Sequence, residues 1–143
     1  GIWYAGEEYD TAVAETRYTQ ERLLRQWGEP AQDVPKQALV AQLSGPAVDV
    51  RPLRTSDPAR YATLHDPDPD HYPPAQSFGR ACRAGSAALI VYHSARRAAA
   101  GAPGKACIGA LRANAIFGAA PRARTTFHWD GRSVSVDPPT YRS

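Results

Sequence analysis

Two short segments place polar side chains where proteins of mixed α/β structure usually build their sites. Near the N-terminus, an apolar run meets a turn and a helix start, which places Tyr4 near a strand end and Glu15 about one turn into the helix. Further on, a second apolar run brings Ser94 just past a strand end, with Arg96 close behind. Strand ends and first helical turns often carry functional groups on a rigid scaffold. A ring, a carboxylate, a hydroxyl and a guanidinium are therefore the candidate site groups.

Each of these residues, taken alone, also has a structural explanation. The helix dipole favours a carboxylate such as Glu15 on a first turn whatever its function. His93 precedes Ser94, but neighbouring residues of an extended segment point to opposite faces, and no Gly-x-Ser-x-Gly turn is present. A serine nucleophile activated by this histidine is therefore not predicted, and Tyr4 alone is typical of a core or rim aromatic.

Other clusters of chemically capable side chains do not predict a metal site. The acidic segment 65–72 has two histidines, but its prolines prevent the glycine-centred turn of a calcium loop. Cys82 and Cys107 lack a CxxC spacing and a nearby histidine, so we expect two small buried thiols, with a disulfide left open. His128 is interpreted as a strand residue before a turn.

The elements that position these residues follow from hydrophobic patterns and turn signals. A helix is predicted over residues 12–27, capped by Asp10 or Thr11 and ended by Gly28, and a second over 75–83. Strands are predicted at residues 2–5, 37–43, 47–50, 87–92, 106–111, 125–129 and 133–136.

Proline-rich stretches predict the irregular parts of the chain. Three Asp-Pro steps and a Pro-Pro pair indicate a loop over residues 54–74, and small residues and glycine indicate a flexible connection over 95–105. Residues 137–143 are expected to form a tail. The whole pattern predicts a single α+β domain with a mixed β core and flanking helices.

Composition narrows the classes of function. The 143 residues are 43% apolar and 22% charged, which suits one globular domain. No apolar stretch is long enough to cross a bilayer and no signal peptide is recognisable, so a cytoplasmic protein is expected. A net charge of +3 suits a phosphate-bearing ligand and equally suits solubility. No DNA-binding or RNA-binding motif and no Gly-x-Gly-x-x-Gly turn is present.

Four blocks of the sequence, in order along the chain, resemble the RES domain family, named for an Arg, a Glu and a Ser. The matching residues are Trp3, Tyr4, Thr11, Ala12 and Glu15; Asp70, Tyr72, Gln76 and Gly79; Tyr92, Ser94 and Arg96; and Trp129, Asp130 and Gly131. We therefore expect the domain to cover residues 1–136.

The resemblance implies a fold like that of the ADP-ribosyltransferase toxins and a toxin that consumes NAD+ as its substrate, without a metal. The implied reaction cleaves the bond between nicotinamide and ribose. Inorganic phosphate, water or a protein side chain then accepts the ADP-ribosyl group, so phosphorylase, glycohydrolase and ADP-ribosyltransferase stay open. The implied partner is an Xre-like antitoxin with a helix-turn-helix, through which nucleic acid would be contacted indirectly.

The resemblance also assigns roles to the candidate residues. Glu15 and Ser94 are the expected catalytic residues: the carboxylate would stabilise positive charge on the ribose, and the hydroxyl would hold the ribose or the amide. Tyr4 would pack against a ring, and Arg96 would contact the pyrophosphate. The family's Arg lies upstream of Trp3, so we expect a domain that is incomplete at its N-terminus. The alternative is a non-catalytic RES-like domain that acts as a protein-interaction module.

Overall fold

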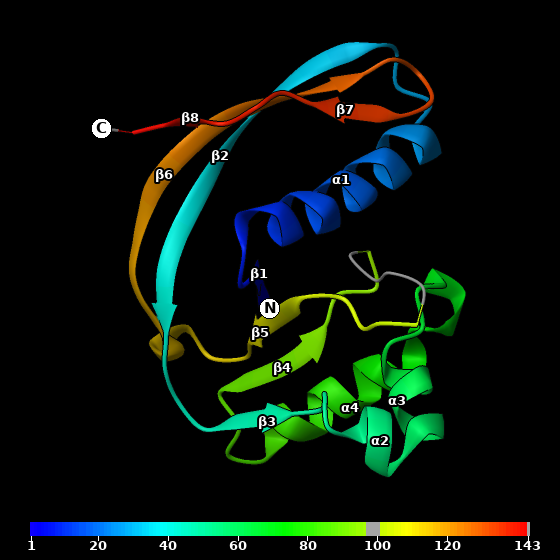
Figure 1. The fold of residues 1–143 in the computed structure, drawn as a ribbon, viewed down its shortest axis with the longest axis vertical. Coiled ribbons are helices and arrows are strands. Elements are labelled where there is room, and N and C mark those ends of the chain that lie inside the picture. Colours follow the sequence, from blue (N-terminus) through cyan, green and yellow to red (C-terminus); the bar gives the residue numbers. More distant parts are fainter. Residues whose placement is uncertain (97–100, 143) are drawn as a thin grey trace.

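The computed structural model describes residues 1–96 and 101–142. It shows an α+β domain, as predicted, in which helices lie beside two β-sheets (Figure 1). Its elements in chain order are β1 (Trp3–Gly6), α1 (Tyr9–Gln26), β2 (Gln32–Leu43), β3 (Ala47–Asp49), α2 (Leu53–Ser56), α3 (Pro58–Leu64), the 3-10 turn η1 (Pro69–His71), α4 (Pro73–Ala84), β4 (Leu89–His93), β5 (Ala106–Ala110), η2 (Ala113–Ala115), β6 (Ile116–Trp129), β7 (Val134–Val136) and β8 (Thr140–Tyr141).

The strands form two sheets. Sheet A has the order β1-β5-β4-β3, antiparallel except for the parallel pair β3–β4. Sheet B has the order β2-β6-β7, and the short β8 also pairs with β6. Figure 1 shows α1 inside the arc of the long β2–β6 ribbon, with sheet A and helices α2, α3 and α4 beyond it. Helix α1 therefore connects the two halves of the molecule.

Apolar side chains build a separate core on each sheet. In sheet B, Leu24 of α1 packs against Phe127 and Trp129 of β6 and against Val134 of β7. In sheet A, small and branched residues pack together, including Ala88, Leu89, Ala110 and Ala115. The apolar stripe of α1 thus faces sheet B, which leaves another face of the helix free for polar side chains.

Helix α1 was predicted well in type and extent but not at its first turn. It begins at Tyr9, with Glu8 as the N-cap and no side-chain capping bond, so the prediction that Asp10 or Thr11 caps the helix was wrong. A tight turn from β1 sets this earlier start. A Cβ on Gly6 would lie 2.6 Å from the backbone nitrogen of Ala12, so a side chain at this position would collide with the helix.

The predicted loop over residues 54–74 is largely helical. Its prolines begin helices rather than prevent them, because a proline at the first helical position lacks only an N–H that would have no partner there. Pro58 begins α3, Pro69 begins η1 and Pro73 begins α4. The Asp57 side chain accepts a hydrogen bond from the backbone N–H of Arg60, as an N-cap should.

Sheet B is longer than predicted at both of its main strands. Strand β2 begins at Gln32 instead of residue 37, and β6 begins at Ile116 instead of residue 125. Within 137–143, where a tail was predicted, β8 pairs with β6. Residues 97–100 of the predicted connection over 95–105 lie outside the described residues.

Candidate active site

Glu15 and Ser94 meet in the folded protein although they are 79 residues apart in the sequence. The Ser94 hydroxyl donates a hydrogen bond of 2.5 Å to Oε1 of Glu15. The backbone N–H of Arg96 donates in turn to Ser94 Oγ, at 3.1 Å. With its lone pair engaged by that N–H, the hydroxyl is oriented with its proton toward the carboxylate. The two predicted catalytic residues are therefore one hydrogen-bonded unit.

The two residues come from elements that the fold holds rigidly. Glu15 is half-buried in the second turn of α1, further into the helix than predicted because the helix begins at Tyr9. Ser94 follows directly after β4, with 2% of its surface exposed, and its backbone N–H donates to the carbonyl of Lys105 at 2.8 Å. His93 does not serve Ser94 as a base, since its Nδ1 pairs with the Tyr61 hydroxyl at 2.7 Å.

A cleft of about 1010 Å³ opens beside the pair. Its lining comes from α1, from one face of sheet A, from α4 and from the segment before η1. Tyr4 of β1 lines it with 64% of its surface exposed, so its ring is accessible to a ligand, as a stacking role requires. On the opposite wall, Gly79 of α4 is buried, yet a Cβ added there would meet no atom within 4 Å. That glycine keeps space open inside the cleft.

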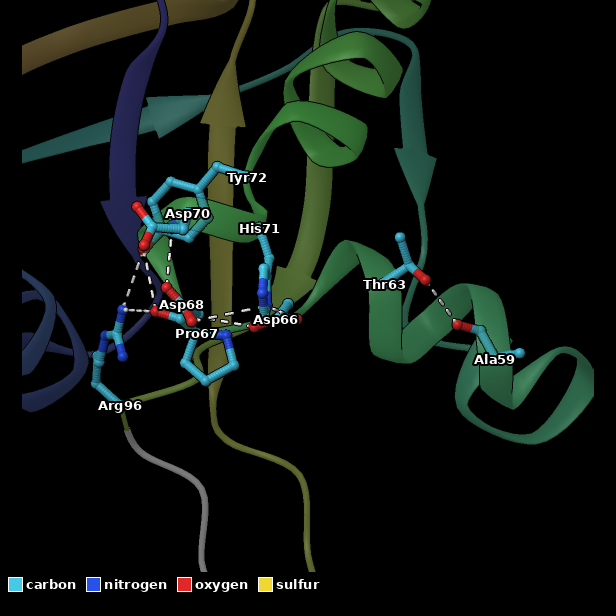
Figure 2. A network of polar contacts seen from close by, with 9 residues as sticks. All are labelled: Ala59, Thr63, Asp66, Pro67, Asp68, Asp70, His71, Tyr72 and Arg96. Carbon is cyan, nitrogen blue, oxygen red and sulfur yellow. Dashed lines mark hydrogen bonds and ion pairs between the residues drawn. The ribbon is translucent and has the colours of Figure 1, made fainter.

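Arg96 lines the cleft and at the same time holds together the polypeptide around it. Its Nη2 donates to the Pro67 carbonyl and to the Tyr72 hydroxyl, each at 3.2 Å, and its guanidinium lies 3.3 Å from the centre of the Tyr18 ring. Figure 2 shows the guanidinium directed at the acidic segment that carries Pro67 and Tyr72. These contacts join α1 to that segment, and a pyrophosphate contact for Arg96 stays a prediction.

The acidic segment is ordered by its own hydrogen bonds. The Asp66 carboxylate accepts from the backbone N–H of Asp68 and pairs with His71 Nδ1 at 2.9 Å, while Asp68 accepts from the backbone N–H of Asp70 (Figure 2). The pKa of the Asp66 carboxyl is lowered, mainly by the Asp68 N–H. Across the described ranges, no three His, Cys, Asp or Glu side chains are placed to hold a metal ion.

Burial keeps the groups beside Glu15 neutral. It raises the pKa of the Cys107 thiol to about 12, with the Glu15 charge as the second cause, and it raises the pKa of the Tyr92 hydroxyl far above its ordinary value. Burial also lowers the pKa of both His65 and His93. Cys82 and Cys107 are free thiols, with Cys107 buried as predicted and Cys82 partly exposed.

Sequence reasoning missed the histidine and tyrosine cluster at one end of the cleft. His65 and His93 line the cleft, and Tyr61 contacts both rings. Tyr61 and His65 fall in the stretch that was predicted to be a loop. Their four-residue spacing places both on one face of a helix, and it would have indicated this contact once a helix was expected.

A half-buried carboxylate and a buried hydroxyl beside a large cleft define a candidate ligand-binding or active site in an α+β domain. The family model of the RES domain matches residues 1–130, so the chain belongs to the RES domain family. That membership is consistent with a toxin-like, NAD-related domain, in a family whose domains generally act on NAD as enzymes. No curated protein matches the chain. Among the described residues, no helix has the length and apolar character needed to cross a membrane.

Proposed function

We propose that this protein cleaves the bond between nicotinamide and ribose in NAD+. The observation that carries the proposal is the Ser94–Glu15 hydrogen bond at the wall of a cleft of about 1010 Å³, in a chain of the RES domain family. A cavity of several hundred Å³ or more is the usual size for a cofactor-sized ligand. The cleft is also lined by Arg80, Arg83 and Arg96, whose charges suit a diphosphate.

The chemistry follows from the charge that develops on the ribose. When nicotinamide leaves, the ribose carbon becomes oxocarbenium-like, and a fixed carboxylate stabilises that positive charge most where water is scarce. Oε1 of Glu15 is occupied by the Ser94 proton. Within the described part of the chain, no hydrogen bond engages Oε2, which is therefore available to a ribose hydroxyl. Glu15 acts on the substrate, and Ser94 fixes the carboxylate that does so.

Membership of the RES domain family suggests the acceptor and the partner. The acceptor of the ADP-ribosyl group is phosphate, water or a protein side chain, and Tyr4 provides a stacking surface for one of the rings. A toxin acting in the cytoplasm and neutralised by a helix-turn-helix antitoxin completes the proposal. NAD+ is the substrate, and the family resemblance implies a reaction without a metal.

The proposal is tested by NAD+ consumption, with and without phosphate, by the 143-residue chain and by the complete gene product. Glu15→Gln keeps the shape of the side chain and removes its charge, so we expect turnover to fall by about 100-fold or more with unchanged thermal unfolding. Glu7→Gln is the matched control, since Glu7 is exposed in the turn before α1. Turnover by Glu15→Gln equal to that of the unmodified protein would contradict the proposal. A folded protein without turnover would favour the interaction module instead.

A further inference from the structure

Strand β3, which pairs with the outer edge of β4, ends before β4 reaches Ser94. Strand β3 pairs with β4 as far as Asp49, opposite Val91, and the backbone N–H of Val50 then donates to the Val91 carbonyl. On the inner side, β5 continues along β4 to the end of the strand. The next N–H on the outer edge belongs to His93, and no strand of the described residues lies there to accept it. A side chain does so instead: Nε2 of His65 accepts the His93 N–H at 3.1 Å.

The hydrogen bonds of His65 determine its protonation. Its Nδ1 lies 2.9 Å from the carbonyl oxygen of Tyr61. A carbonyl accepts, so Nδ1 carries the proton; a backbone N–H donates, so Nε2 carries the lone pair. His65 is therefore the neutral Nδ1–H tautomer. A charged imidazolium would present a proton to the His93 N–H and break the contact.

The surroundings of His65 hold the ring in place and favour that neutral form. It stacks on the Tyr61 ring with the centroids 3.9 Å apart. The other titratable rings near it are those of His93, 5.9 Å away, and Tyr92, 6.4 Å away. Burial lowers the pKa of His65, and the hydrogen bond to the Tyr61 carbonyl opposes this only in part, so the neutral imidazole is favoured.

We propose that His65 is a positioning residue for Ser94: its neutral imidazole replaces the missing strand at the end of β4 and sets where the serine hydroxyl stands against Glu15. The backbone at this point is then held from both sides, by His65 at the His93 N–H and by the Lys105 carbonyl at the Ser94 N–H. His65 acts through the backbone of its neighbour and need not touch the substrate. The inference rests on the proposed function.

Two substitutions separate the hydrogen-bond acceptor from the ring. His65→Phe keeps a flat ring to stack on Tyr61 and removes the acceptor, whereas His65→Gln keeps an acceptor at the reach of Nε2. A displacement of a catalytic group by about 1 Å can cost about 100-fold in rate. We expect His65→Phe to lower kcat for NAD+ cleavage by about 10-fold to 100-fold with little change in KM, and His65→Gln to recover most of it. His128→Gln, the same exchange in sheet B, is the control.

Amide hydrogen exchange, followed by NMR on the full chain, tests the contact without relying on turnover. The His93 amide should be protected in the unmodified protein and in His65→Gln, and should exchange faster in His65→Phe. Thermal unfolding verifies that each variant is folded; if His65→Phe does not fold, His65→Gln still tests the proposal, since it should keep both kcat and protection.

Several results would overturn the inference: an unprotected His93 amide in the unmodified protein, an unchanged kcat in folded His65→Phe, or the loss of kcat and protection in His65→Gln. A folded protein that does not consume NAD+ would instead overturn the proposed function, and with it the catalytic purpose of His65. The exchange experiment would still report whether the contact exists, so the two failures are distinguishable.

Discussion

The two sheets of this domain have different structural roles, and helix α1 lies between them. Sheet B is a long, continuous ladder: β2 and β6 span 12 and 14 residues, and the buried rings of Phe127 and Trp129 pack against α1. Sheet A is built from strands of three to five residues whose ends are completed by turns and side chains. The comparison teaches that sheet B stabilises the frame, while the short strands of sheet A leave room for the cleft.

We therefore expect a substitution in the core of sheet B to lower stability without changing the chemistry of the site. Phe127→Ala removes a side chain that is 2% exposed, and such a change typically costs about 3–5 kcal/mol in the free energy of unfolding. Urea unfolding measures this loss. NAD+ turnover per folded molecule should stay close to that of the unmodified protein at low temperature. A fall in turnover beyond the unfolded fraction would show that the two regions are not separable.

A substitution at the junction of β1 and α1 should lower both the stability of the domain and its turnover of NAD+. The Cβ of Gly6→Ala would lie 2.6 Å from the Ala12 nitrogen, so the helix must shift, at a cost of about 1–3 kcal/mol. Because α1 carries Glu15, turnover should fall as well. Thermal unfolding and NAD+ consumption measure the two effects.

Gly28→Ala is the control for this junction at the other end of α1. Gly28 has a φ of +62° and open space around it, so alanine there costs stability of the order of 1 kcal/mol through backbone conformation alone. We expect turnover to be retained in this variant. Equal losses of turnover in both variants would show that α1 transmits strain along its whole length.

At Gly79, which lines the cleft, we expect a substitution to raise stability and to weaken activity. Glycine inside a helix costs about 0.5–1 kcal/mol relative to alanine, and here no close contact requires it. Gly79→Ala should therefore raise the melting temperature and, by placing a methyl group in the cleft, raise KM for NAD+ several-fold. A more stable variant with unchanged KM would mean that no substrate reaches this wall.

The prediction from sequence succeeded where local patterns decide the structure. The apolar run that precedes Ser94, the run over residues 106–111 and the amphipathic pattern of α1 predicted the elements that carry the site. It failed where tertiary context decides. Pro35 is accommodated in β2, and the irregular ladder between β2 and β6 extends a strand that the local sequence does not favour.

The candidate site itself was predictable only as a set of residues. Glu15 and Ser94 could be named from their positions and from the family resemblance, but the hydrogen bond between them depends on how the fold brings α1 to the end of β4. Arg96 could be named from its charge, but not its stacking on Tyr18. The contact of His65 with the end of β4 could not be found, because its partner is a backbone N–H exposed by the early end of β3.

The smallest expected effect is on the pH dependence of stability, through one histidine beside each sheet. His128 in sheet B bridges Asp33 and Asp137, with its ring nitrogens 2.7 and 2.8 Å from their carboxylates. The Asp33 hydrogen bond, followed by that of Asp137, raises the pKa of His128 above its ordinary 6.5. Its stabilising contribution is therefore present in acid and is lost as the pH rises through the raised value.

The contribution of His65 to stability depends on pH in the opposite direction. Burial lowers its pKa below 6.5, so its contribution is complete above that pH and is lost as the pH falls toward the lowered value. Melting temperatures between about pH 5 and pH 9 measure both effects. The unmodified protein should exceed His128→Gln most in acid and His65→Gln most at neutral to alkaline pH. Difference curves that slope in the same direction with pH would show that the two imidazoles are not held in opposite charge states.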